Sequence, residues 1–151
     1  MPSLQKSVRL SEQTVETIKQ ISQHEINYNA AINNIAQRYA LVCQHSLPEL
    51  TEFQRLAIAQ AFNGRMVSLE NIEHEIKTVP WAISEAVKYD GNVVELLWQD
   101  HKDMALDDFM KSDELAAFVD MANNWSFAEK MAVLHNALAF WSRDNLPEFD
   151  E

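Results

Sequence analysis

Histidine and carboxylate side chains, which are common protein ligands of transition metals, gather at two places in the sequence. Residues 70–74 read Glu-Asn-Ile-Glu-His, and residues 100–103 read Asp-His-Lys-Asp. Neither spacing matches the Glu-x-x-His of di-iron bundles or the His-Glu-x-x-His of zinc proteases. We therefore interpret these groups as solvated helix faces and expect no metal site and no cofactor.

Nucleophilic catalysis finds no better support in the sequence. There is no glycine-rich phosphate loop, no Gly-x-Ser-x-Gly elbow and no cysteine paired with histidine in a recognisable context. The single cysteine, Cys43, falls near the apolar face of a predicted helix, which favours a buried thiol over a reactive one. We expect that the protein is not an enzyme.

Residues 5–11 (Gln-Lys-Ser-Val-Arg-Leu-Ser) alternate between polar and apolar side chains. Val8 and Leu10 would lie on one face of an extended chain, and Ser7 and Arg9 on the other, which is typical of a strand with one buried face. The pattern predicts one short strand, and no second strand pattern follows it in the chain.

Two amphipathic helices are predicted directly after this strand. Ser11 is a favourable N-cap for the first helix, which extends to about His24. Asn27 is a favourable N-cap for the second, which extends to about Val42. The apolar positions at helical spacing are Val15, Ile18 and Ile21 in the first helix, and Ala31, Ile32, Ile35, Ala36, Tyr39 and Val42 in the second.

A lone strand leaves N–H and C=O groups unpaired along both edges, which favours pairing with the same strand of a second copy. The order strand, helix, turn, helix therefore predicts a homodimer held by an intermolecular two-stranded sheet. Residues 7–12 supply the strand and first cap, and residues 26–36 (Ile-Asn-Tyr-Asn-Ala-Ala-Ile-Asn-Asn-Ile-Ala) supply the turn and second helix. On these features residues 4–43 resemble the ribbon-helix-helix family of DNA-binding proteins, of the Arc and MetJ type.

The resemblance implies a role for individual residues. In that family the paired strands lie in the major groove of DNA and their outward side chains contact base edges, while a phosphate binds at the N-terminus of the second helix. Gln, Ser and Arg are all side chains that hydrogen-bond to base edges. The implied base contacts are Gln5, Ser7 and Arg9; the implied phosphate contacts are Lys6, Asn27, Tyr28 and Asn29; the implied dimer core is Val8, Leu10, Ile18, Ile32 and Ile35.

The same segment allows a second interpretation. Residues 4–10 would then be a disordered leader, and residues 12–43 would be two further helices of a larger bundle.

Charge is distributed unevenly along the chain, whose net charge is −11. Residues 1–45 hold four basic and three acidic side chains, a net charge of +1, whereas residues 46–151 hold eight basic and twenty acidic side chains, a net charge of −12. An acidic surface repels phosphate, so any contact with DNA is expected from the N-terminal part.

A domain boundary is predicted at residues 44–48, where Pro48 disfavours helix at the preceding residue. We thus expect a DNA-binding and dimerisation module over residues 1–45 and an acidic domain over residues 46–151. Thr51 opens a new helix, Asn63-Gly64 ends it, and Ser126 with Glu129 forms the capping-box pattern of the last helix. Because no strand pattern occurs after residue 45, the second domain is predicted to be an all-α bundle of five to seven helices.

The four tryptophans, at positions 81, 98, 125 and 141, are expected mainly in the core. Trp125 is the exception, because residues 123–126 (Asn-Asn-Trp-Ser) place it between two predicted helices. We predict that Trp125 contacts a protein partner. The alternative is that it closes the gap between the helices as a hydrophobic staple before the Ser126 cap.

The predicted fold class is mainly α, with an N-terminal ribbon-helix-helix followed by a helical bundle. We expect a cytoplasmic, dimeric, sequence-specific regulator of transcription that binds double-stranded DNA, a repressor with antitoxin and plasmid-transfer accessory roles as variants. No run of residues has the length of a membrane span, and no secretory signal pattern opens the chain, so no membrane association is expected. The alternative function is an acidic helical module that binds a protein partner and no DNA.

Overall fold

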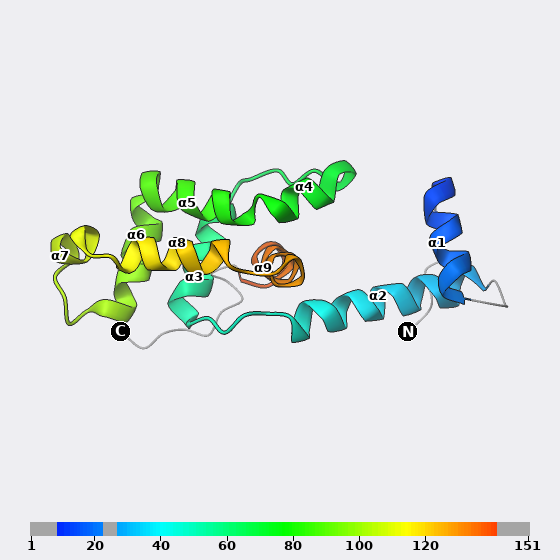
Figure 1. Ribbon diagram of the computed structural model, residues 1–151, viewed down its shortest axis with the longest axis horizontal. Helices are drawn as coiled ribbons and strands as arrows, with labels where there is room; N and C mark the ends of the chain where they lie inside the picture. The colour runs from blue at the N-terminus through cyan, green and yellow to red at the C-terminus, as the bar shows by residue number, and fades with distance from the viewer. Residues whose placement is uncertain (1–8, 23–26, 142–151) are drawn as a thin grey trace. The chain divides into compact units, whose positions relative to one another are not determined.

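The structure, a computed structural model, describes residues 9–22 and 27–141. Over these residues the chain is mainly helical, with nine α-helices and two short 3-10 helices (Figure 1). In chain order the elements are α1 (Glu12–Ser22), α2 (Tyr28–His45), α3 (Glu52–Phe62), η1 (Leu69–Asn71), α4 (Ile72–Lys77), α5 (Val79–Tyr89), α6 (Gly91–Trp98), η2 (Gln99–His101), α7 (Leu106–Lys111), α8 (Glu114–Asn123) and α9 (Phe127–Ala139).

The predicted helical class is confirmed for the described part of the chain, where α3 to α9 follow one another with no strand between them. The predicted strand at residues 5–11 lies mostly outside the described residues and stays a prediction. Helices α1 and α2 begin directly after Ser11 and Asn27, the two predicted caps.

The chain divides into two compact units, Met1–Leu41 and Val42–Glu151. The sequence-based division fell between residues 45 and 46, at the C-terminal end of α2. Cys43, in the last turns of α2, has a buried thiol, as predicted.

Helix α3 begins at a capping box. The Thr51 Oγ1 accepts a hydrogen bond from the Gln54 backbone N–H at 3.1 Å, and the Gln54 side-chain oxygen accepts one from the Thr51 backbone N–H at 2.9 Å. The helix ends at Phe62, and Gly64 follows with a φ of 74°, a left-handed conformation that glycine adopts without a steric penalty. This turn redirects the chain toward η1 and α4.

A single aspartate joins α5 to α6. The Asp90 backbone N–H donates to the Ala86 carbonyl at 2.8 Å and closes α5, while its carboxylate accepts from the Asn92 backbone N–H at 3.0 Å and caps α6. The other carboxylate oxygen accepts from the Gln60 side chain of α3 at 3.3 Å. Three helices thus meet at one residue, α5 through its backbone and α3 and α6 through its carboxylate, which fixes the direction of α6 against α3.

The core of the second unit lies around α3, which packs most extensively against α6 and also against α9 and α5. The largest of its side chains that are almost fully buried are Ile58, Val79, Ile83, Val93, Phe109 and Val133. Burial of such a side chain stabilises the folded state by about 1.5–3 kcal/mol, so this cluster supplies much of the stability of the unit. None of the helices in the described part combines the length and the apolar character that a membrane crossing requires.

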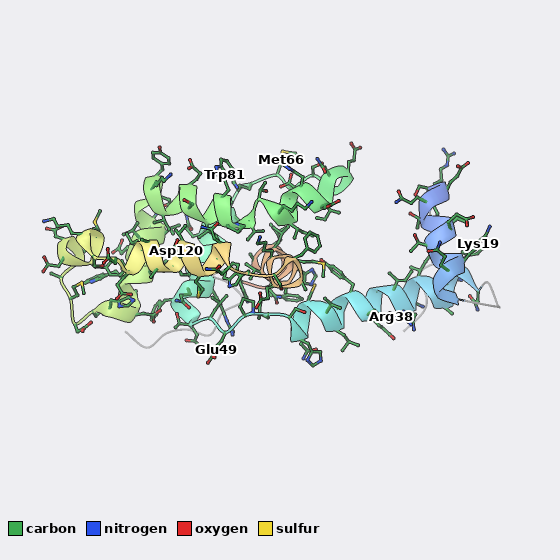
Figure 2. The ribbon with its side chains drawn as sticks, viewed as in Figure 1. Lys19, Arg38, Glu49, Met66, Trp81 and Asp120 are labelled. Carbon is green, nitrogen blue, oxygen red and sulfur yellow. The ribbon has the colours of Figure 1, made fainter. Side chains whose placement is uncertain are left out.

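The expectation that the tryptophans lie mainly in the core is wrong for Trp81, which is 56% exposed. Its neighbours Val79, Ala82 and Ile83 occupy the face of α5 that packs on the core, and this periodicity turns position 81 outward. Figure 2 shows Trp81 and Met66 on the outer side of the unit. Met66 is 97% exposed, in the segment between α3 and η1.

The capping box of α9 allows a direct test of local helix stabilisation. Ser126 Oγ accepts from the Glu129 backbone N–H at 3.2 Å, and the Glu129 carboxylate accepts from the Ser126 backbone N–H at 2.5 Å. We predict that Ser126→Ala lowers the free energy of unfolding by about 0.5–2 kcal/mol, because it removes the side-chain acceptor. Chemical denaturation measures this change.

The matched control is Ser68→Ala. Ser68 occupies the same position before η1 but makes no side-chain capping bond. Its substitution should change the free energy of unfolding by less than about 0.5 kcal/mol. Equal losses in the two variants would contradict the assigned role of the Ser126 hydroxyl.

Candidate nucleic-acid interface

The residues predicted to contact DNA bases are described only in part. Gln5 and Ser7 lie outside the described residues, and so do Lys6, a predicted phosphate contact, and Val8, a predicted dimer-core residue; the roles of all four stay predictions. Arg9 is described: its side chain is exposed just ahead of α1. The one described base-contact candidate is therefore accessible to a ligand.

Hydrogen bonds at the start of α1 fix how the chain enters that helix. Ser11 Oγ accepts from the Thr14 backbone N–H at 3.2 Å and lies 2.8 Å from the Thr14 hydroxyl. Leu10 just before the cap is half-buried, and Ile18 on the second turn of the helix is only 1% exposed. Ile18, one of the predicted dimer-core residues, is thus already buried by residues of its own chain.

The N-terminus of α2 holds three of the four residues predicted to contact a phosphate. Asn27 Oδ1 accepts from the Ala30 backbone N–H at 3.2 Å, and the Asn27 carbonyl accepts from the Ala31 N–H at 2.9 Å. The backbone N–H groups of Tyr28 and Asn29 have no hydrogen-bond acceptor among the described residues. Open N–H groups at a helix start, together with the positive end of the helix dipole, attract anions.

The charge of α2 also suits an anion. Its 18 residues contain no aspartate or glutamate, and the Arg38 side chain on its surface is exposed. This contrasts with the net charge of −12 over residues 46–151. Helix α2 therefore repels a phosphate less than the acidic residues 46–151 do.

An apolar face of α2 remains exposed in the single chain. Tyr28, Ile32, Ile35 and Tyr39 follow one another in alternating steps of four and three residues, the spacing of one helix face. Ile32 is 38% exposed, Ile35 is half-buried, and both tyrosines are exposed. In the N-terminal unit, the residues described as buried are Ile18 and Ala31. Two of the predicted dimer-core residues therefore retain surface that a second chain would cover.

The structure places Trp125 in the core rather than on the surface. Its side chain is 6% exposed and belongs to the same apolar cluster as Ala122 and Val133. A ring buried between α8 and α9 offers little area to a partner, so this placement favours the alternative interpretation, in which Trp125 closes the gap between the two helices.

In the first group of histidines and carboxylates, Glu70, Glu73 and His74 are exposed, whereas His101 of the second group is half-buried and stacks on Phe109. Among the described residues, no three His, Cys, Asp or Glu side chains come together in a way that would hold a metal ion. Lys77 Nζ lies 2.6 Å from the Glu73 carboxylate, and its hydrogen bond and positive charge lower the pKa of Glu73. Residues 70–74 thus include a carboxylate already engaged by a lysine.

The contrast between the two tryptophans predicts different costs of truncation. Trp125→Ala should lower the free energy of unfolding by about 3–5 kcal/mol, because it empties a space in the core. Trp81→Ala should cost about 1 kcal/mol, close to the value of an exposed cation–π contact. Chemical denaturation monitored by circular dichroism measures both, and a larger loss for Trp81→Ala would contradict this placement.

Comparison of the chain with protein-family models, with curated proteins and with solved structures finds no match. A DNA-binding role therefore stands as a proposal that rests on the residues of the N-terminal unit and on the properties of α2.

Proposed function

We propose that the protein is a dimeric, sequence-specific DNA-binding regulator of transcription, acting as a repressor. The observation that carries the proposal is the character of α2, which combines open N–H groups at its start, no acidic side chain and an exposed apolar face. The first two properties suit a phosphate, and the third suits a second copy of the chain. Antitoxin and plasmid-transfer accessory roles are variants of the same DNA-binding chemistry.

The proposed contacts follow the ribbon-helix-helix resemblance. Two N-terminal strands, one from each protomer, would pair and enter the major groove, and the N-terminus of α2 would bind the flanking phosphate. Base contacts would come from Gln5, Ser7 and Arg9; phosphate contacts from Lys6, Asn27, Tyr28 and Asn29; the dimer core from Val8, Leu10, Ile18, Ile32 and Ile35.

The acidic unit would serve oligomerisation or bind a protein partner. Its charge disfavours a second DNA contact, because a net charge of −12 over residues 46–151 repels phosphate. The second candidate function is a protein-interaction module without DNA binding. It is favoured by the exposure of Met66, Trp81 and Tyr89 on this unit, since large exposed apolar side chains are common anchors at protein interfaces.

Fluorescence anisotropy tests the DNA-binding role, with a labelled fragment from upstream of the protein's own gene and a scrambled fragment over a salt series. We predict that Arg9→Gln weakens binding to the upstream fragment by about 1–3 kcal/mol, because a bidentate contact to guanine is lost. Binding to the scrambled fragment should change little. The logarithm of the wild-type association constant should fall linearly with the logarithm of the salt concentration. The slope should correspond to the few phosphates contacted.

The control for Arg9→Gln is Arg38→Gln, which removes the same charge from an exposed position on α2. It should alter binding to both fragments slightly and equally. Equal effects of the two variants on both fragments would contradict a role for Arg9 in base recognition. No binding of the folded wild-type protein to either fragment at low salt would favour the second candidate function.

Dimerisation is tested at the exposed face of α2. Ile32→Glu should convert a dimer into monomers in sedimentation velocity, because it places a charge in an apolar interface. Asn33→Glu adds the same charge at an exposed position one residue away and should leave the dimer intact. A wild-type protein that stays monomeric at all concentrations, or dimers in both variants, would contradict the proposed interface.

A further inference from the structure

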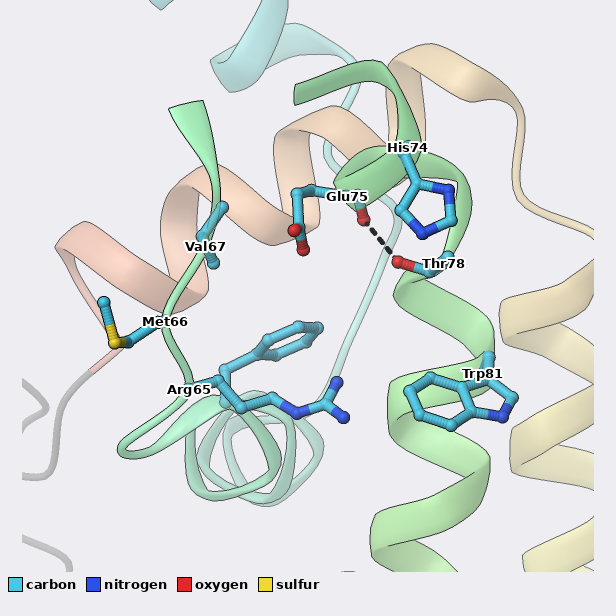
Figure 3. Close-up of a pocket in the computed structure, with 8 residues that line it drawn as sticks. Arg65, Met66, Val67, His74, Glu75, Thr78 and Trp81 are labelled. Atoms are coloured by element: carbon cyan, nitrogen blue, oxygen red, sulfur yellow. Dashed lines mark hydrogen bonds between the residues drawn. The ribbon is translucent and has the colours of Figure 1, made fainter. Parts of the chain in front are cut away.

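A pocket of about 270 Å³ opens on the surface of the second unit, where the turn after α3 passes α4 and the start of α5 (Figure 3). Its wall combines aromatic, aliphatic and charged side chains. The lining residues are Phe62, Arg65, Met66, Val67, His74, Glu75, Thr78 and Trp81. Ligand sites typically have mainly apolar walls and volumes of about 300–1,000 Å³. Here four lining side chains are apolar and four are polar or charged. A volume just below that range suits a small ligand.

Arg65 supplies a positive charge at this pocket. Its backbone N–H donates to the Phe62 carbonyl at 3.1 Å in the turn formed at Gly64, and its guanidinium carbon lies 5.2 Å from the centre of the Trp81 ring. Among the described residues no carboxylate oxygen lies within 4.0 Å of its guanidinium nitrogens. Trp81 therefore orients the Arg65 guanidinium, and the N–H groups of the guanidinium stay available to an anionic group.

Glu75 supplies a negative charge at the same pocket. Its carboxylate accepts one hydrogen bond, from the Ser68 backbone N–H at 3.3 Å, and no basic side chain in the described part of the chain lies within 4.0 Å of it. The neighbouring Glu73 differs, because Lys77 already binds its carboxylate. Figure 3 shows the Glu75 carboxylate apart from Arg65, whose side chain extends toward Trp81.

Two opposite charges thus line one small pocket without pairing with each other. A ligand with a single negative charge would be attracted by Arg65 but opposed by Glu75 and by the acidic unit around it. A ligand with a single positive charge would be attracted by Glu75 but repelled by Arg65. A zwitterion satisfies both side chains and carries no net charge to be repelled, and an apolar group on it would contact the aromatic walls.

We propose that this pocket binds a free amino acid with an apolar side chain. Arg65 would bind its carboxylate, Glu75 its ammonium group, and Phe62, Val67 and Trp81 its side chain. His74, which also lines the pocket, would offer a further hydrogen bond. The inference is independent of DNA binding, because the pocket lies wholly within residues 62–81 of the second unit.

Three related probes test the proposal by calorimetry and by NMR of the tryptophan indole N–H signals. They are L-phenylalanine, 3-phenylpropionate, which lacks the ammonium group, and phenethylamine, which lacks the carboxylate. L-phenylalanine should bind and shift the Trp81 signal, which is identified by its loss in Trp81→Phe. Each of the other two should bind at least about tenfold more weakly, because a charge-assisted hydrogen bond is missing.

Two pairs of variants separate specific contacts from net charge. Arg65→Gln and Glu75→Gln should each weaken the binding of L-phenylalanine by about tenfold or more, and Glu75→Gln keeps an oxygen for the Ser68 N–H. The controls are Lys88→Gln and Glu85→Gln, which make the same charge changes in an ion pair on α5 outside the pocket. These should leave the affinity unchanged, and circular dichroism checks that all four variants fold.

Three results would overturn the proposal. The first is no binding of L-phenylalanine, L-leucine or L-methionine at millimolar concentration to the folded protein. The second is an affinity for 3-phenylpropionate or phenethylamine equal to that for L-phenylalanine. The third is an affinity that Arg65→Gln and Glu75→Gln change no more than their charge-matched controls do.

Discussion

The N-terminal unit is constrained by how little apolar surface its own residues bury. Ile18 and Ala31 are the buried side chains described in it, and each contributes at most a few kcal/mol. Ordering the backbone costs about 1–2 kcal/mol per residue, so the burial of these two side chains offsets only a small part of that cost. In the proposed dimer, a second protomer that covers Ile32 and Ile35 would enlarge this core, and folding of this part of the chain would then be coupled to assembly.

Helix starts are the features that the sequence predicts best in this protein. Ser11, Asn27 and Ser126 each accept a hydrogen bond from a backbone N–H three residues later, and that bond depends only on the local chain. Burial depends on how distant helices pack, and local patterns predict it less well. Trp125 and Trp81 show this, because the first is buried and the second is exposed, the opposite of what their sequence neighbourhoods indicated.

The pocket beside α4 could not be predicted from the sequence for the same reason. Arg65 and Glu75 are separated by residues 66–68, by η1 and by the first half of α4, and neither forms a motif with its neighbours. Their presence at one pocket follows from the packing of α3, α4 and α5. The cap of α2 and the absence of acidic residues along it, in contrast, are properties of a continuous segment, and a sequence shows them directly.

The buried thiol of Cys43 gives the chain an internal probe of its own dynamics. Because the thiol is shielded in the last turns of α2, a thiol reagent reaches it only when that segment opens. The rate of modification under native conditions then measures the free energy of a local opening, separately from global unfolding. With no second cysteine in the sequence, the signal belongs to one site and needs no engineered label.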